Sequence, residues 1–322
     1  MRLPVDSCGA QPQRPSMTRA RFTKLLCDGA RAWRDGVMGT ALTGGTELGP
    51  WPMRNRIAAA PSRLRDAASG RCVLVTGASS GIGRAVALKV AEAGAEAILV
   101  ARSEEKLREL QGEIEQRGGR ARAYPADLAS QASADALLDR LARDGVAVDV
   151  LINSAGRSIR RPVDESYERM HDFERTMAIN YFGSLRLILG LLPAMRARRR
   201  GHVINVSSAG VLVGTPRFSA YIASKAALDA FTRVAGAEAR EDGVLFATVH
   251  MPLVRTPMIE PTEAFRRAPA LSPEDAADLV LRPIVTGERQ LGTQLARLLQ
   301  LGHVLAPDLF EHVVSAGHRC EG

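Results

Sequence analysis

A glycine-rich turn between an apolar run and a helix constrains the fold of this 322-residue chain more than any other feature. Residues 72–75 (Cys-Val-Leu-Val) are typical of a short buried strand, and Thr76–Gly83 follows them directly. Glycines are needed there because the backbone must turn tightly and approach a phosphate without an intervening Cβ. The helix that begins in the turn directs unpaired N–H groups to the same place, which favours an anion. A tight strand–helix connection that binds nothing is the less favoured interpretation.

Further short apolar runs occur at residues 97–100, 148–152, 202–206 and 245–249, and helical stretches of ten or more residues separate them. Strands that alternate with helices indicate a parallel sheet covered on both faces. The fold class is therefore α/β, a Rossmann-type doubly wound parallel sheet in a single catalytic domain over residues 67–322. A C-terminal helical segment is expected from about residue 288. Its leucine stripe should pack onto the domain, with a lid or membrane contact as the alternative, and comprises Leu291, Leu295, Leu298 and Leu299.

Residues 1–66 carry most of the excess positive charge, with 11 Lys or Arg against 5 Asp or Glu in a chain of net charge +8. This segment is rich in Arg, Gly and Pro and lacks periodicity. We expect a mostly disordered, irregular N-terminal extension, with a short helix near residues 23–33 and with Met53 as a second candidate start. A solvated segment is favoured over peripheral contact with a membrane. Aromatic residues are scarce and no basic stripe accompanies them, so no nucleic acid partner is expected.

The end of the second expected strand distinguishes the two nicotinamide cofactors. NAD-binding proteins commonly place a carboxylate there, whereas NADP-binding proteins use a cation. This chain has Ala101-Arg102-Ser103, and the guanidinium of Arg102 can pair with a 2′-phosphate through its planar fork. An exposed arginine without a role is the alternative. The sequence therefore predicts NADP(H). Its phosphate contacts are expected at Gly77, Ser79, Ser80, Gly81, Ile82 and Gly83.

Tyr221 and Lys225 lie four residues apart, which places a phenol and an ammonium on one face of a helix. A neighbouring cation favours the phenolate, so we expect Lys225 to lower the pKa of Tyr221 and make it a better acid towards a developing alkoxide. Ser208 follows the strand that ends at Val206, and its hydroxyl could hold the substrate oxygen. Together with the glycine-rich turn, these three residues indicate carbonyl chemistry with a bound cofactor more specifically than any one of them does alone.

Residues 71–307 resemble a classical short-chain dehydrogenase/reductase. Thr76–Gly83 is similar to the family's TGxxxGxG, and Asn153-Ser154-Ala155-Gly156 is similar to its NNAG motif with serine at the second position. Asn180 matches the catalytic asparagine of the family, and Ser208, Tyr221 and Lys225 match the other three catalytic residues. The resemblance implies that Lys225 also holds the nicotinamide ribose and that Asn180 anchors a relay water. Further cofactor contacts are implied at Asp127, Leu128, Asn153, Ala155, Gly156 and Thr256.

Longer stretches of the sequence indicate one subgroup of that family. Met251-Pro252 stands where the family usually has Pro-Gly, and the surrounding sequence resembles bacterial NADPH-dependent fatty acyl-CoA reductases. The strings that carry this resemblance are residues 156–161, 171–176, 217–221, 251–258 and 271–279. None of the four cysteines (Cys8, Cys27, Cys72, Cys320) is placed for nucleophilic attack, and none has metal-ligand spacing. A thioester would therefore accept hydride directly at its carbonyl carbon.

We expect the protein to be a cytoplasmic enzyme, peripheral to the membrane at most, that reduces long-chain acyl-CoA to the aldehyde and binds no metal. Arg157, Arg160 and Arg161 follow the fourth expected strand and could bind the CoA phosphates; a solvated basic loop is the alternative. A homo-oligomer is expected, although the C-terminal ending of many tetrameric relatives is absent. The competing functions are a ketone or aldehyde reductase, an alcohol dehydrogenase and a non-catalytic NADP(H)-binding regulator.

Overall fold

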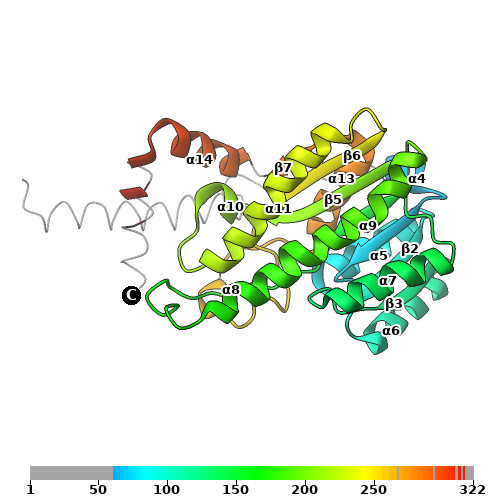
Figure 1. Ribbon diagram of the computed structural model, residues 1–322, viewed down its shortest axis with the longest axis horizontal. Coiled ribbons are helices and arrows are strands. Elements are labelled where there is room, and N and C mark those ends of the chain that lie inside the picture. The colour runs from blue at the N-terminus through cyan, green and yellow to red at the C-terminus, as the bar shows by residue number, and fades with distance from the viewer. Residues whose placement is uncertain (1–60, 267, 293, 309–310, 313–314, 316–322) are drawn as a thin grey trace, which may run out of the picture.

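A seven-stranded parallel sheet forms the centre of the molecule (Figure 1). The computed structural model describes residues 61–308 apart from 267 and 293, together with 311–312 and 315. The strand order β3-β2-β1-β4-β5-β6-β7 reverses direction between β1 and β4, which is the doubly wound arrangement that the sequence predicts. The strands are β1 (Cys72–Thr76), β2 (Glu96–Ala101), β3 (Arg120–Pro125), β4 (Val150–Asn153), β5 (Gly201–Ser208), β6 (Val244–Met251) and β7 (Gln290–Gly292).

Helices cover both faces of the sheet because the central strands are apolar on both sides. On one face the core includes side chains from α4 (Pro61–Ala68), α5 (Gly81–Glu92), α6 (Glu104–Gln116) and α13 (Pro273–Thr286). On the other face it includes side chains from α7 (Gln131–Arg143), α9 (Ser184–Ala197) and α11 (Ser219–Glu238). Val73 and Val75 of β1 face the first of these layers and Leu74 faces the second, so alternate residues of one strand hold both layers.

Two of the seven strands were not predicted from the sequence. β3 reads Arg-Ala-Arg-Ala-Tyr-Pro, an edge strand whose alternate arginines reach solvent, and it lacks a continuous apolar run. β7 has three residues and pairs in parallel with β6. Leu291 lies in this strand and is buried there, so its assignment to a helical leucine stripe was wrong. The expected helix exists as α14 (Gln294–Leu305) and begins after that strand.

The N-terminal boundary of the folded unit also differs from the prediction. Residues 61–66 were assigned to the irregular extension, but they belong to α4. Leu64 and Ala68 of this helix are buried against the layer that contains α5 and α13. The mostly polar sequence of α4 buries just these two side chains, which is why no helical period was evident. Residues 1–60, including the expected short helix near 23–33, lie outside the described residues.

One continuous helix of 28 residues, Met170–Ala197, runs through three segments of different geometry. It comprises α8 (Met170–Met177), a π-helical segment η2 (Ala178–Gly183) and α9. Leu187, Ile188 and Met195 of α9 pack into the core against the sheet. The helix is long and apolar enough to cross a membrane by length and composition. That is weak evidence, since the core helix of a soluble protein passes the same test.

Beyond one end of the sheet, Figure 1 shows α10 (Gly210–Val213) next to α14, while α8 lies apart from them beside α11. α14 packs beside α10, which directly follows the end of β5. Leu301, Val304 and Leu305 of α14 remain largely exposed. The C-terminal helix therefore contacts the domain, as expected, while part of its apolar surface faces outward.

Candidate active site

A cavity of about 630 Å³ lies at the carboxyl ends of β1, β2, β3 and β4. In an open parallel sheet this is the crevice where ligands bind, because the strand order reverses between β1 and β4. Its wall contains most of the residues expected to contact the cofactor: Gly77, Ser79, Ser80, Gly81, Ile82, Gly83, Arg102, Asp127, Leu128, Ala155, Gly156 and Thr256. The structure thus brings together segments that are up to 179 residues apart in the sequence.

The glycines of the turn are required by close backbone approaches. Gly77 has φ +69°, and a Cβ there would lie 2.9 Å from the Cα of Ala155. A Cβ on Gly83 would overlap the carbonyl oxygen of Gly77 and lie 2.7 Å from its carbonyl carbon. Gly81 has φ +52° and would meet Thr256 at 2.8 Å. The turn can therefore present N–H groups and the start of α5 to a phosphate with no side chain in between, which fits a dinucleotide.

Thr76 ties the ends of β1 and β4 together beneath this turn. Its hydroxyl oxygen accepts hydrogen bonds from the backbone N–H groups of Ser154 and Ala155, both at 3.0 Å. Asn153, expected as a cofactor contact, does not line the cavity. It is buried in β4, where its amide donates to the side-chain oxygen of Asn205 at 2.8 Å. This asparagine holds β4 to β5, so the structure gives it a supporting position behind the cofactor cavity.

Two cations face the part of the cavity at the end of β2. Arg102 lines it as predicted, and Lys106 of α6, which was not predicted from the sequence, lines it as well. The signal was present in the sequence, because Lys106 falls in the first turn of the helix that follows Arg102. Glu104, the carboxylate nearest to Arg102 in the sequence, forms an ion pair with Arg108 at 2.5 Å and is not among the residues that line the cavity. Asp127 lies across the same cavity, and its carboxylate accepts from the backbone N–H of Ala129 at 3.0 Å. The paired cations suit a 2′-phosphate.

Lys225 and Tyr221 project from α11, and Ser208 ends β5. The ammonium of Lys225 donates to the carbonyl of Val206 at 2.7 Å, and a Cβ on Gly156 would be 3.6 Å from its Nζ. The hydroxyl of Ser208 lies near enough to Tyr221 to lower the pKa of its phenol by hydrogen bonding. The candidate proton donor, the cation and the strand-end serine are therefore in one place, next to the motif that follows β4.

Burial dominates the acid–base properties of this pair. It raises the pKa of Tyr221 to about 12, while the hydrogen bond with Ser208 lowers that pKa and the charge of Asp229 raises it. Burial also lowers the pKa of Lys225 to about 8, against an upward effect of Asp229. The expected depression of the Tyr221 pKa is therefore absent from the protein alone. Removal of the phenol from water penalises its charged form, and this penalty exceeds the help available from nearby donors.

Asn180 lies in the π-helical segment and is completely buried. Its side-chain oxygen accepts from the N–H of Arg157 at 2.8 Å, and its amide donates to the carbonyl of Arg157 and to the Oγ of Ser224, each at 2.9 Å. The asparagine thus fastens the loop after β4 to the helix that carries Tyr221. Single π turns inside α-helices occur frequently at functional sites.

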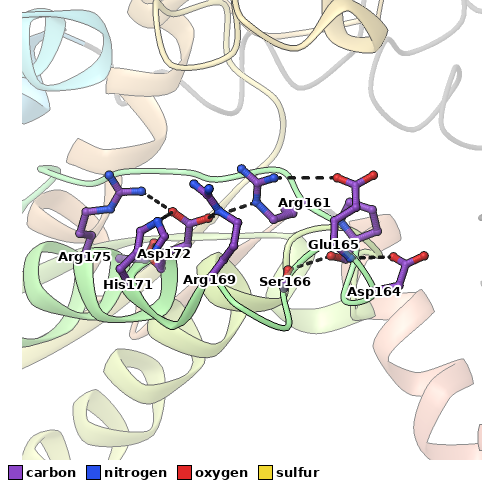
Figure 2. Close-up of polar contacts among 10 residues, drawn as sticks. Arg161, Asp164, Glu165, Ser166, Arg169, His171, Asp172 and Arg175 are labelled. Atoms are coloured by element: carbon purple, nitrogen blue, oxygen red, sulfur yellow. Dashed lines mark hydrogen bonds and ion pairs between the residues drawn. The ribbon is translucent and has the colours of Figure 1, made fainter.

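The three candidate substrate arginines have different surroundings. Arg157 is exposed, Arg160 is half-buried with polar interactions of its own, and Arg161 forms an ion pair with the buried Asp172 at 3.1 Å. Figure 2 shows Asp172 surrounded by Arg161, Arg169 and Arg175. Burial acts to raise the pKa of Asp172, but hydrogen bonds from Arg169, Arg175 and Arg161 outweigh it and hold the pKa well below its usual range. This cluster, which sequence reasoning missed, anchors the loop after β4 to α8.

Cys72 is the one cysteine within the part of the chain that the structure describes. It opens β1, at the opposite end of that strand from the glycine-rich turn. Burial raises its pKa to about 12, with the charges of Glu96 and Asp149 acting in the same direction. A thiol with such a pKa is not a nucleophile at neutral pH.

Comparison with known proteins agrees with this geometry. Residues 71–267 match the short chain dehydrogenase family. A fatty acyl-CoA reductase of Acinetobacter baylyi is 49% identical over 254 residues, which cover 79% of this chain and 86% of the relative. A fatty acyl-CoA reductase of Mycobacterium tuberculosis is 42% identical over 250 residues, covering 77% and 84%.

Solved structures show the same fold with NADP bound. One, described as an NAD(P)-dependent gluconate 5-dehydrogenase from Beutenbergia cavernae, has a TM-score of 0.65 and 28% identity, covering 71% of this chain and 97% of that one. A 3-oxoacyl (acyl-carrier-protein) reductase from Agrobacterium tumefaciens has a TM-score of 0.62 and 28% identity, covering 69% and 89%. With the family match extending over most of the domain, this chain belongs to the short chain dehydrogenase family.

Proposed function

We propose that this protein reduces long-chain fatty acyl-CoA to the fatty aldehyde with NADPH as the reductant. The observation that carries the choice of substrate is the 49% identity, over 254 residues, to a relative named fatty acyl-CoA reductase. The residues for carbonyl reduction accompany it, because Tyr221, Lys225 and Ser208 meet next to the cofactor cavity. The chain is an NADP(H)-dependent oxidoreductase, and the acyl-CoA is the more specific part of the proposal.

The cofactor cavity supports the assignment of NADP(H). The Gly77–Gly83 turn would hold the pyrophosphate, Arg102 and Lys106 would hold the 2′-phosphate, and Thr256 lines the same cavity next to Gly81. When bound, NADPH supplies the hydride. Lys225 would hold the ribose next to the nicotinamide, and its charge would favour loss of the proton from Tyr221 at the moment of transfer.

The carbonyl step needs two protein groups. Ser208 would hold the thioester oxygen by a hydrogen bond, so that the carbonyl carbon is presented for attack. As the new C–H bond forms, the C=O π electrons move to oxygen, and Tyr221 gives that oxygen its proton. The product is a hemithioacetal. When its C–S bond breaks, the carbonyl re-forms as the aldehyde, and the sulfur leaves with the electron pair and takes up a proton as free CoA.

Direct reduction of the thioester is also favoured by the position of Cys72. An enzyme that forms a covalent acyl-thiol intermediate needs an accessible thiolate at the reacting carbon. Cys72 is at the far end of β1 and its pKa is raised, so it does not meet that need. The proposed reaction therefore proceeds without an acyl-enzyme on this residue.

For the CoA moiety, we propose that the exposed guanidinium of Arg157 and the neighbouring Arg160 contact its phosphates. Arg161 would instead keep the loop in place through Asp172. The anchoring of Arg157 by Asn180 fixes the start of this loop relative to the catalytic helix. A fixed loop loses less conformational entropy when the phosphates bind.

The test is to follow NADPH oxidation and the release of free CoA together, with acyl-CoAs of increasing chain length and with aldehydes and ketones as alternative substrates. We expect NADPH loss with long-chain acyl-CoA, and equal molar amounts of free CoA and aldehyde. The Tyr221→Phe protein is the control for background hydrolysis. NADPH oxidation with aldehydes or ketones but not with any acyl-CoA would contradict the proposal and favour an ordinary carbonyl reductase.

A further inference from the structure

A buried hydrogen-bonded pair of side chains joins the helix that carries Tyr221 and Lys225 to the neighbouring strand β6. His250 of β6 and Asp229 of α11 are joined by a contact of 2.7 Å between Nε2 and Oδ2. Their side chains are only 7% and 5% exposed. Asp229 follows Lys225 by four residues, so the two lie one turn apart on the same face of α11. The mechanism described above does not use this pair.

The second carboxylate oxygen of Asp229 is also buried and has no hydrogen-bond partner within the described part of the chain. Beside it lies a cavity of about 200 Å³, large and polar enough to admit water, which can keep a carboxylate ionised. The charged or titratable groups of its described lining are Asp229 and Arg233 of α11 and His250 of β6. The other lining residues are uncharged: Val211 and Leu212 of α10, Ala226 of α11, Gln290, Leu291 and Gly292 of β7, and Gln300 of α14.

Lys225 needs such a counter-charge. It is buried, and it donates a hydrogen bond to a neutral group, the carbonyl of Val206. Burial alone favours the neutral amine, which could neither attract the phenolate nor hold the ribose as strongly. The carboxylate of Asp229 acts against this effect and raises the pKa of Lys225. It also raises the pKa of Tyr221, so both groups retain their protons to higher pH.

We propose that Asp229, oriented by His250, is a positioning residue for the reduction: its buried carboxylate keeps the ammonium of Lys225 charged at the working pH. His250 donates its Nε2–H to the carboxylate and so holds that carboxylate in place one turn from Lys225. This inference rests on the proposed role of Lys225 as the group that holds the nicotinamide ribose.

The test measures NADPH binding by cofactor fluorescence between pH 6 and 10, together with the pH profile of kcat. In the wild-type protein we expect binding to weaken as Lys225 deprotonates. In the Asp229→Asn protein this basic limb should move to lower pH by about one unit, from the loss of one charge at helical i,i+4 separation. The kcat limb should move in the same direction, because both catalytic groups lose their proton more easily.

Arg233→Gln is the matched control, since it removes a charge from the same cavity wall at an exposed position and should leave the limb in place. Two substitutions of His250 should shift the basic limb of NADPH binding by different amounts. His250→Leu leaves Asp229 buried without a donor, which favours its protonation, so the limb should shift nearly as far as in Asp229→Asn. His250→Gln keeps an N–H donor and should shift the limb less than half as far as His250→Leu.

An unshifted limb in Asp229→Asn, or an equal shift in Arg233→Gln, would overturn the proposal. If Asp229→Asn does not fold, the comparison of His250→Leu with His250→Gln tests the proposal instead. The proposal is rejected if NADPH binding weakens at the same pH in those two proteins. The binding measurement needs no acyl-CoA, so it is independent of the substrate assignment. The Lys225→Ala protein tests the role of Lys225 separately. If its NADPH binding still weakens at the same basic pH as in the wild type, the proposed role of Lys225 is wrong.

Discussion

Replacing Gly83 with alanine should weaken both the fold and the binding of NADPH, although alanine is the better helix former. Gly83 is the third residue of α5. A Cβ at this position would overlap the carbonyl oxygen of Gly77 and approach its carbonyl carbon to 2.7 Å and the nitrogen of Ala78 to 3.1 Å. The neighbours are backbone atoms of the cofactor turn, so they cannot rotate out of the way as a flexible side chain would.

The magnitude follows from two opposing effects. An alanine in place of glycine within a helix stabilises it by about 1 kcal/mol. Overpacking costs about 1–3 kcal/mol, and an overlap with backbone atoms that must move belongs in the upper part of that range, about 2–3 kcal/mol. We therefore expect a net loss of about 1–2 kcal/mol in the free energy of unfolding, a drop in Tm of roughly 2–8 °C for a domain of this size. A displaced turn that loses one hydrogen bond to a phosphate should bind NADPH about tenfold more weakly.

Thermal unfolding and NADPH titration by fluorescence measure the two effects. Gly112→Ala is the matched control, because Gly112 lies within α6 and a Cβ there would meet nothing within 4 Å. That variant should gain about 0.5–1 kcal/mol and bind NADPH as the wild type does. If the Gly83→Ala protein is as stable as Gly112→Ala and keeps its NADPH affinity, the steric argument for the turn is refuted.

Three further predictions concern other residues. Tyr221→Phe should bind NADPH with nearly unchanged affinity and lose at least about 100-fold in kcat, because only the proton donor is removed; single-turnover kinetics measure this, and retained turnover contradicts the mechanism. Arg102→Asp should reduce the preference for NADPH over NADH in kcat/KM by about 100-fold, and a wild-type enzyme that already prefers NADH would disprove the assignment. Burial, helped by the charge of Arg71, lowers the pKa of His202 to about 4, so the unfolded chain binds a proton between pH 6.5 and 4 that the folded protein does not. Stability should therefore fall by roughly 3 kcal/mol across that window, and His202→Phe should remove this part of the slope in urea unfolding at each pH.

The central part of the fold was predictable because its strands are continuous apolar runs. The five predicted strands correspond to β1, β2, β4, β5 and β6, which are interior strands of the sheet. The edge strands β3 and β7 were missed, since one alternates arginine with alanine and the other has just three residues. α4 was missed for a related reason: it needs only two buried side chains, and its partners are distant in the sequence.

The site was predictable where chemistry depends on local spacing. The glycine-rich turn and the pair Tyr221 and Lys225 are examples, and Arg102, which lines the cavity, was also predicted from the sequence. What could not be predicted depends on tertiary surroundings. The burial that sets the pKa of Tyr221 comes from several elements, and the enclosure of Asp172 by three arginines joins a loop to a helix. Neither has a local sequence signal.

The π-helical segment in the long helix has a consequence for insertions and deletions. Asn180 lies within this segment and is turned to the loop after β4, while Leu187 and Ile188 of α9 are turned to the core. Each residue of an α-helix corresponds to a rotation of about 100°. A π turn holds more residues than an α turn, so loss of a single residue between 178 and 183 with a return to α geometry would leave α9 in nearly its present orientation, with Leu187 and Ile188 still in the core. Such a deletion would instead change which residue stands at the position of Asn180, and we expect it to break the contacts with Arg157 and Ser224 rather than the packing of α9.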